Sequence, residues 1–167
     1  MTLARRLSLA LTVVAVLVAA GAAQARDMVP IHPGYRAGDI VIMTGARQLY
    51  FVLGGGQAIR YPVGVGKAGM AWHGTAYVSL KRMSPPWQAP PSINGGRYGA
   101  VIPGGSPNNP MGVAVLGLDR GNYAIHGTNN PSSIGGYVSH GCIRMYNSDV
   151  LDLYARAGVG TQVTVLR

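Results

Sequence analysis

The sequence of 167 residues predicts a mainly β fold, a sandwich or a barrel, with one helix near the C-terminal end. Short runs of β-forming residues recur along the chain, and glycine and proline, the residues typical of turns, separate them. Only one segment has the spacing of apolar residues that is typical of an amphipathic helix. The sequence shows no internal repeat, and its length favours one domain.

The expected strands are short and begin at residue 40. The segment 48–53 is rich in β-formers, the glycines at 54–56 can adopt the positive φ angles of a tight turn, and apolar residues then recur at every second position over 59–65. This pattern predicts a β-hairpin. The strands expected along the whole chain are 40–43, 48–53, 59–65, 76–80, 113–116, 123–125 and 161–166.

The helix is expected over 148–157. Asn147 is a residue type that caps helix N-termini, Asp149 in the first turn and Arg156 in the last turn match the helix dipole, and Gly158 can end the helix. Apolar residues at spacing i, i+3, i+4 supply a buried face, namely Val150, Leu153 and Tyr154.

Residues 1–25 are predicted to be a secretory signal peptide. Arg5 and Arg6 form a positive start, an apolar run covers 7–20, and small residues precede a cleavage point after Ala25. A membrane anchor is the alternative, but the apolar run is short for a span. The protein is therefore expected to be exported to the periplasm or cell envelope, with no stable membrane span after cleavage.

Residues 26–37 are expected to form a short extended arm, because Pro30 and Pro33 discourage helix, and residues 38–167 a single domain. The chain carries 14 lysines and arginines against 5 acidic residues, a formal charge of +9. A positive exported protein suits an anionic polymer or a membrane face. Nucleic acid is the rival partner of a basic chain, but export and the scattering of the basic residues disfavour it.

The segment 84–110 differs in composition from the rest, with seven prolines and several glycines. Loops of this length inside a domain are usually either functional or irregular. We expect it to line a substrate site, where Trp87 and Tyr98 could cover a ligand. An irregular surface excursion is the alternative.

Cys142 is the only cysteine of the chain, so it cannot form an internal disulfide. In an exported protein a lone thiol is exposed to oxidising conditions. Three roles remain for it: an intermolecular disulfide, an inert buried thiol, or a reactive nucleophile.

Histidines accompany this cysteine. His140 stands two residues before it and His126 ends a predicted strand, where a general base would be held firmly. Gly141 allows close approach of a substrate to the backbone, whose N–H groups could stabilise an oxyanion. A base also needs an acceptor that orients its ring, and the Gly127 carbonyl is the nearest candidate. Zinc bound by Cys142, His140, His126 and His73 is the alternative, but the spacing is unusual for a zinc site.

These residues resemble the signature of a known family, the L,D-transpeptidases or YkuD domain family. Cys142 lies 16 residues after His126, a spacing within the family's pattern. Upstream segments at 48–50, 61–66 and 74–75 are also similar, so the resemblance covers about residues 38–166. The motif itself consists of Ile125-His126-Gly127 and Ser139-His140-Gly141-Cys142-Ile143-Arg144.

The resemblance implies a β-sandwich of mixed sheets with one or two short helices and 38–167 as the catalytic domain. It implies Cys142 as nucleophile, His126 as general base and the Gly127 carbonyl as the group that orients His126. No metal or organic cofactor is implied. Substrate binding or oxyanion stabilisation, with the Gly141 and Cys142 N–H groups as donors, falls to the remaining motif residues: Ser139, His140, Gly141 and Arg144.

The activity implied is acyl transfer from a tetrapeptide stem of peptidoglycan, releasing D-alanine, to an amine on a second stem, which forms a 3→3 cross-link. Carbapenems are then expected to acylate the cysteine. Three alternatives remain. Water as acceptor would make an L,D-carboxypeptidase, an outer-membrane lipoprotein as acceptor would make an anchoring enzyme, and an inert thiol would leave a non-catalytic wall-binding protein.

Overall fold

The computed structural model describes residues 27–167 and confirms a mainly β protein with mixed sheets and one α-helix, α1 (Asn147–Arg156). The predicted signal peptide, residues 1–25, lies outside the described residues. In order from edge to edge, the main sheet contains β1 (Asp27–Pro30), β4 (Gln57–Pro62), β3 (Gln48–Gly54), β2 (Ile40–Met43), β13 (Gln162–Leu166), β6 (Gly74–Met83), β9 (Ala114–Leu118), β10 (Ala124–His126) and β12 (Ile143–Arg144).

Two pairs of short strands stand beside this sheet. β5 (Val65–Gly66) pairs in parallel with β11 (Tyr137–Ser139), and β7 (Trp87–Gln88) pairs antiparallel with β8 (Val101–Ile102). Two short 3-10 helices, Pro91–Ile93 and Pro131–Ser133, complete the regular structure of residues 27–167. In the main sheet β2 with β13 and β10 with β12 are parallel, and the other neighbours are antiparallel.

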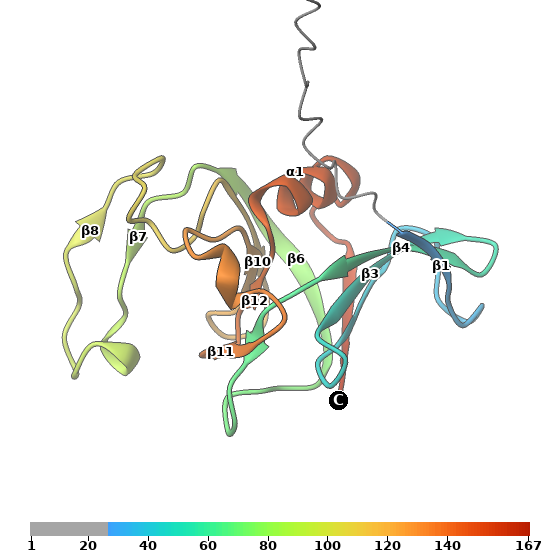
Figure 1. Ribbon diagram of the computed structural model, residues 1–167, viewed down its shortest axis with the longest axis horizontal. Coiled ribbons are helices and arrows are strands. Elements are labelled where there is room, and N and C mark those ends of the chain that lie inside the picture. The colour runs from blue at the N-terminus through green and yellow to red at the C-terminus, as the bar shows by residue number, and fades with distance from the viewer. Residues whose placement is uncertain (1–26) are drawn as a thin grey trace, which may run out of the picture.

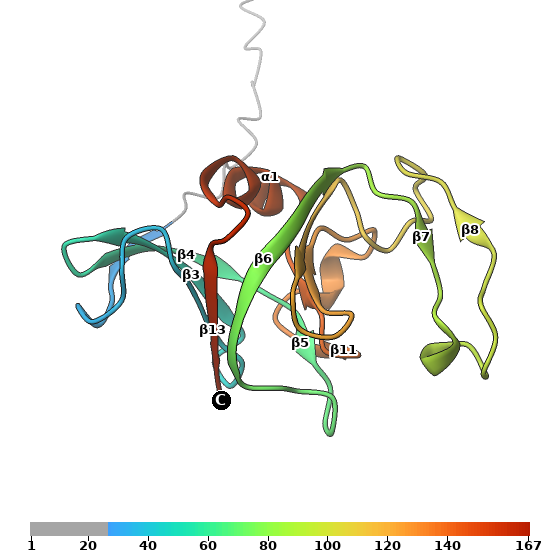
Figure 2. The ribbon, with the colours of Figure 1, turned by 180° about the vertical axis from the view of Figure 1, so that it is seen from behind.

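Strand β6 joins the two halves of the main sheet. Its first part pairs with β13 and its second part with β9, and the register shifts between Val78 and Leu80. Such irregularities bend a strand and increase its twist. The strands β1–β4 and the strands β9, β10 and β12 therefore lie on opposite sides of β6 and β13, and α1 lies across one end (Figures 1 and 2).

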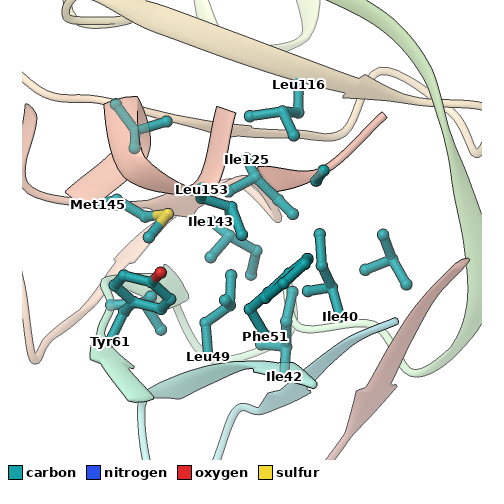
Figure 3. Close-up of a cluster of buried hydrophobic side chains, with 14 of the residues drawn as sticks. Ile40, Ile42, Leu49, Phe51, Tyr61, Leu116, Ile125, Ile143, Met145 and Leu153 are labelled. Atoms are coloured by element: carbon teal, nitrogen blue, oxygen red, sulfur yellow. The ribbon is translucent and has the colours of Figure 1, made fainter. Parts of the chain in front are cut away.

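The hydrophobic core lies between these two halves. Leu49, Tyr61 and Ile42 come from the β2–β4 half, and they face side chains from β9, β10, β12 and α1 in Figure 3. Each fully buried aliphatic side chain contributes roughly 1.5–3 kcal/mol. The facing group includes Leu116, Ile125, Ile143, Met145 and Leu153.

The predicted return strand 59–65 is divided in the structure. β4 ends at Pro62, and the chain then leaves β3 for the other half of the molecule. There Gly64 donates its N–H to the Arg144 carbonyl at 2.9 Å and accepts the Arg144 N–H at 2.8 Å. A Cβ at position 64 would lie 2.7 Å from the Ser133 carbonyl oxygen, so only glycine fits.

The predicted cap of α1 is wrong. Tyr146 occupies the N-cap position and makes no side-chain capping bond, while Asn147 is the first helical residue. The Asn147 Oδ1 instead accepts the Thr128 N–H at 3.0 Å. The side chain of Asn147 thus ties the helix start to the loop after β10. Asp149 in the first turn and Arg156 in the last turn stand where the sequence predicts.

The segment 84–110 is not irregular throughout, because β7 and β8 form a small sheet within it (Figure 1). The side chain of Asn109 links the two ends of the segment 84–110 by hydrogen bonds. This buried side chain donates from Nδ2 to the carbonyls of Pro85 at 2.8 Å and Pro103 at 3.1 Å, and its Oδ1 accepts the Met111 N–H at 2.9 Å. A role of Trp87 and Tyr98 in covering substrate stays a prediction.

We expect Asn109→Ala to loosen this segment without unfolding the domain. The change removes the donor to the buried Pro85 carbonyl and to the part-buried contact at Pro103, and a buried group left unsatisfied costs about 1–3 kcal/mol. Limited proteolysis should cut within 84–110 faster in the variant, while the main sheet keeps its circular dichroism. Asn108→Ala, the exposed neighbour, is the control. Equal cleavage of both variants would contradict the role of Asn109.

No helix within residues 27–167 has the length and apolar character needed to cross a membrane.

Candidate active site

The parallel pairing of β10 with β12 brings the two parts of the sequence motif together. His126 is the last residue of β10 and pairs with Arg144 in β12, and Ile125 pairs with Ile143. Cys142 directly precedes β12. The general-base and nucleophile candidates are therefore carried at one edge of the main sheet by neighbouring strands.

His126 is buried, with 4% of its surface exposed. Its Nδ1 lies 2.6 Å from the Gly127 carbonyl oxygen, which can only accept, so Nδ1 carries the proton and Nε2 has a free lone pair. Burial lowers the pKa of His126 to about 4; the Gly127 hydrogen bond raises it and the Arg144 charge lowers it further. At neutral pH the imidazole is therefore uncharged and able to take a proton.

Steric crowding explains why position 127 is a glycine. A Cβ there would overlap the Asn147 Oδ1, which lies against this backbone because it accepts the Thr128 N–H. The carbonyl that holds His126 is thus fixed by the start of α1, from twenty residues further along the chain.

Cys142 is partly exposed, and its Sγ donates to the Asn122 carbonyl at 3.7 Å. Burial raises the pKa of the Cys142 thiol, although a hydrogen bond from the Ala124 backbone and the charge of Arg144 act in the opposite direction. The thiol is therefore protonated at neutral pH. Thiol and imidazole are both neutral, so attack by sulfur requires removal of the thiol proton.

This electrostatic state predicts the pH dependence of alkylation. Because the pKa of the Cys142 thiol is raised, the rate of alkylation by iodoacetamide should climb continuously through about pH 7 and level off only above the ordinary pKa of a thiol. Cys142 is the only thiol, so loss of free thiol reports on it alone. A rate that is already constant from acid to neutral pH would instead indicate a preformed thiolate–imidazolium pair.

Ser139 fixes the backbone around the cysteine. Its buried Oγ donates to the Cys142 carbonyl at 2.6 Å and accepts the Gly141 N–H at 3.1 Å. The Gly141 N–H, which the sequence assigns to the oxyanion, is thus used within the loop. The Cys142 N–H has no hydrogen-bond partner within residues 27–167 and is the donor left for a substrate.

His140 and Arg144 occupy different environments. His140 is exposed, and its Nε2 lies 3.1 Å from the Nζ of Lys67, so the two side chains are in hydrogen-bond contact. Arg144 is partly buried, and its Nε has no hydrogen-bond partner in the described part of the chain. Its charge acts on both His126 and Cys142.

The residues weighed as zinc ligands do not gather into a metal site. Across residues 27–167, no group of three or more His, Cys, Asp or Glu side chains could hold a metal ion.

Sequence reasoning missed the aromatic residues that pack against the cysteine loop. The rings of Trp72 and Tyr123 are stacked, with centroids 5.2 Å apart and planes 4° apart. Trp72 donates from Nε1 to the Gly141 carbonyl at 3.0 Å. No local pattern could have found them, because Trp72 lies in the loop between β5 and β6, far along the chain from Cys142.

Comparison with known proteins identifies the type of domain. The family model described as YkuD, L,D-transpeptidase catalytic domain, matches residues 37–165. The probable L,D-transpeptidase YbiS of Escherichia coli (strain K12) is 37% identical over 144 residues, which cover 80% of this chain and 44% of that protein. The chain thus spans less than half the length of this curated relative.

Solved structures share the fold. L,D-transpeptidase 3 from Mycobacterium tuberculosis, in complex with a faropenem-derived adduct, aligns with a TM-score of 0.62 at 16% identity, over 78% of this chain and 60% of that one. The catalytic domain of an E. faecium L,D-transpeptidase acylated by ertapenem aligns with a TM-score of 0.61 at 20% identity, over 80% of this chain and 100% of that one.

Proposed function

This chain belongs to the L,D-transpeptidase (YkuD) catalytic-domain family, and on that premise we propose that it is a peptidoglycan L,D-transpeptidase with Cys142 as nucleophile and His126 as general base. The observation that carries the proposal is the neutral, buried His126, whose Nδ1 is engaged by the Gly127 carbonyl, on the strand beside the one that follows Cys142.

The first half of the proposed reaction forms a thioester. As the Cys142 sulfur attacks the carbonyl carbon of the third residue of a tetrapeptide stem, the Nε2 of His126 takes the thiol proton. The carbonyl oxygen becomes an oxyanion, which the Cys142 N–H can stabilise. The intermediate then collapses, the bond to the terminal D-alanine breaks, and the His126 imidazolium returns the proton to the leaving amine.

The second half transfers the acyl group to an amine. The amine of a neighbouring stem attacks the thioester carbonyl, loses a proton to His126, and forms the 3→3 cross-link as the sulfur leaves and regains a proton. Water in place of the amine gives L,D-carboxypeptidase activity, and a lipoprotein amine gives an anchoring reaction. No metal or organic cofactor takes part in this proposal.

The remaining site residues serve substrate binding in this proposal. The Arg144 guanidinium, with its Nε unpartnered in the described residues, and the exposed pair of Lys67 and His140 offer positive or donor groups near Cys142. Such groups suit the carboxylates of a stem peptide. Ser139 and Gly141 act by holding the loop.

We further propose that the protein works outside the cytoplasm, in the periplasm or cell envelope. The support is the signal-peptide pattern of residues 1–25, which the segment 26–37 and the proposed catalytic domain 38–167 follow. Within the segment 26–37, β1 pairs with β4 and so extends the main sheet of that domain. Residues 26–167 keep 12 of the 14 lysines and arginines, since Arg5 and Arg6 lie in the signal-peptide pattern, and all 5 acidic residues, so their formal charge of +7 suits an anionic wall. Peptidoglycan stems are the proposed partners, with no nucleic acid and no stable membrane span.

The experiment that tests the function is mass spectrometry of the purified protein incubated with disaccharide-tetrapeptide, following protein and products together. A thioester on Cys142 with a dimeric 3→3 product is the expected result. An adduct with only tripeptide product would change the assignment to hydrolase or to an enzyme that lacks its acceptor. Absence of both adduct and product would overturn the enzyme assignment in favour of a wall-binding protein.

A further inference from the structure

Trp72 makes a buried hydrogen bond to the cysteine loop from a distant part of the sequence. It lies in the loop that connects β5 to β6, and only 8% of its surface is exposed. Its Nε1–H donates to the carbonyl of Gly141, the residue before the proposed nucleophile, at 3.0 Å. The Nε1–H is the only hydrogen-bonding group of a tryptophan side chain, and this contact uses it.

Aromatic packing fixes the direction of this donor. The Tyr123 ring stacks on the indole, and the Arg120 guanidinium lies over it, 5.1 Å from the ring centroid. Tyr123 also packs against Gly141, where a Cβ would overlap its ring. The indole is therefore held in one orientation against the loop.

The backbone around Cys142 consists of three successive peptide units, and Ser139 holds the two outer ones. Its Oγ accepts the Gly141 N–H and donates to the Cys142 carbonyl. The unit between them contains the Gly141 carbonyl and the Cys142 N–H, and Trp72 is its only hydrogen-bond partner within the described residues.

This middle unit is the one that could rotate. Gly141 has a φ of 114°, and glycine passes between backbone conformations with little steric penalty. In a planar trans peptide the C=O and N–H point in opposite directions. Holding the Gly141 carbonyl toward Trp72 therefore aims the Cys142 N–H away from it.

We propose that Trp72 is a positioning residue of the oxyanion site: its bond to the Gly141 carbonyl keeps the Cys142 N–H aimed at the oxygen of the acylating carbonyl. This inference rests on the proposed acyl transfer at Cys142. In this inference Trp72 contacts neither the substrate nor the sulfur of Cys142. A hydrogen bond to the Gly141 carbonyl also polarises the peptide between Gly141 and Cys142, which makes the Cys142 N–H a stronger donor.

Two reactions of the same thiol separate this role from general support of the fold. Acylation by ertapenem adds Cys142 sulfur to the β-lactam carbonyl, breaks the ring C–N bond and passes through an oxyanion, whereas alkylation by iodoacetamide displaces iodide and forms no oxyanion. Loss of an oxyanion donor costs about 10²–10³-fold, and loss of its alignment should cost less.

The test compares Trp72→Phe with the wild-type protein, by mass spectrometry of the two adducts over time. We expect acylation to slow by about 10- to 100-fold, because the ring still stacks but cannot donate, and alkylation to stay within about twofold at each pH. Tyr154→Phe, which removes a hydroxyl on α1, is the control for loss of one aromatic polar group. Trp72→His retains a ring N–H and should recover part of the acylation rate.

The outcomes are distinguishable. If the wild-type protein is acylated and Trp72→Phe is acylated at the same rate, the inference is overturned and the proposed function stands. A parallel fall of acylation and alkylation would assign Trp72 to the structure of the loop and also overturn it. Absence of acylation in the wild type would remove the proposed function and this inference together. If Trp72→Phe does not fold, Trp72→Leu carries the comparison as the variant without a donor: a fall of acylation relative to alkylation supports the donor role, and an unchanged ratio of the two rates overturns it.

Discussion

Cys142→Ala is expected to abolish the acyl-enzyme and all turnover of the tetrapeptide. Cys142 is the only cysteine, so no second thiol can replace it, and His126 has then no nucleophile to activate. Mass spectrometry after incubation with substrate should show the unmodified mass at every time point. The fold should persist, because the side chain is partly exposed and contributes little to the core.

Cys142→Ser sharpens this experiment. Serine keeps the size and the donor but is a far weaker nucleophile, so a trace of slow acylation would show that the site still binds substrate and directs attack. Ser148→Ala, an exposed position at the start of α1, serves as the control for purification and assay. Turnover by Cys142→Ala at the wild-type rate would contradict the assignment of Cys142 as the nucleophile.

His126→Asn is expected to lower the acylation rate by about 10²–10⁴-fold, the usual contribution of a general base. Asparagine can still donate to the Gly127 carbonyl but offers no basic nitrogen, so the geometry is retained while proton transfer is lost. His32→Asn, an exposed histidine after β1, is the matched control and should be fully active. A fully active His126→Asn would move the base role to His140.

The same variant has a second readout in the pH dependence of stability. In the folded protein the pKa of His126 is about 4, against an ordinary value of 6.5, so between these pH values the unfolded chain binds the proton and the folded one does not. Stability should therefore fall as the pH drops from 6.5 to 4, by about 3 kcal/mol from this group. Denaturant unfolding of His126→Asn should lack this contribution, whereas His32→Asn should keep it.

Local patterns were sufficient to predict most of the strands and the helix. Alternating apolar residues and glycine turns marked the β3–β4 hairpin, and the i, i+3, i+4 spacing marked α1. The strand expected at 59–65 was divided because Gly64 pairs with Arg144, eighty residues away, and no local pattern reports such a partner.

The candidate site divides in the same way. The motif residues His126 and Cys142 could be found from residue types and spacing, because their chemistry is rare and concentrated. The role of Asn147 could not be predicted, because asparagine is a residue type that favours the N-cap, whereas in the structure its carboxamide holds the loop after β10. Trp72 could not, because a hydrogen bond between loops distant in sequence leaves no periodicity.

The double hydrogen bond between Gly64 and Arg144 limits how a peptide can approach this site. β12 is the last strand of the main sheet, and an open edge strand is a template onto which an extended peptide can add. Gly64 occupies both the N–H and the C=O of Arg144 on that side, so the edge beside the cysteine is closed. An extended peptide therefore cannot add to β12 as a further strand at Arg144, and we expect the stem peptide of the proposed reaction to approach Cys142 across the end of the strands, held by side chains and by single backbone donors.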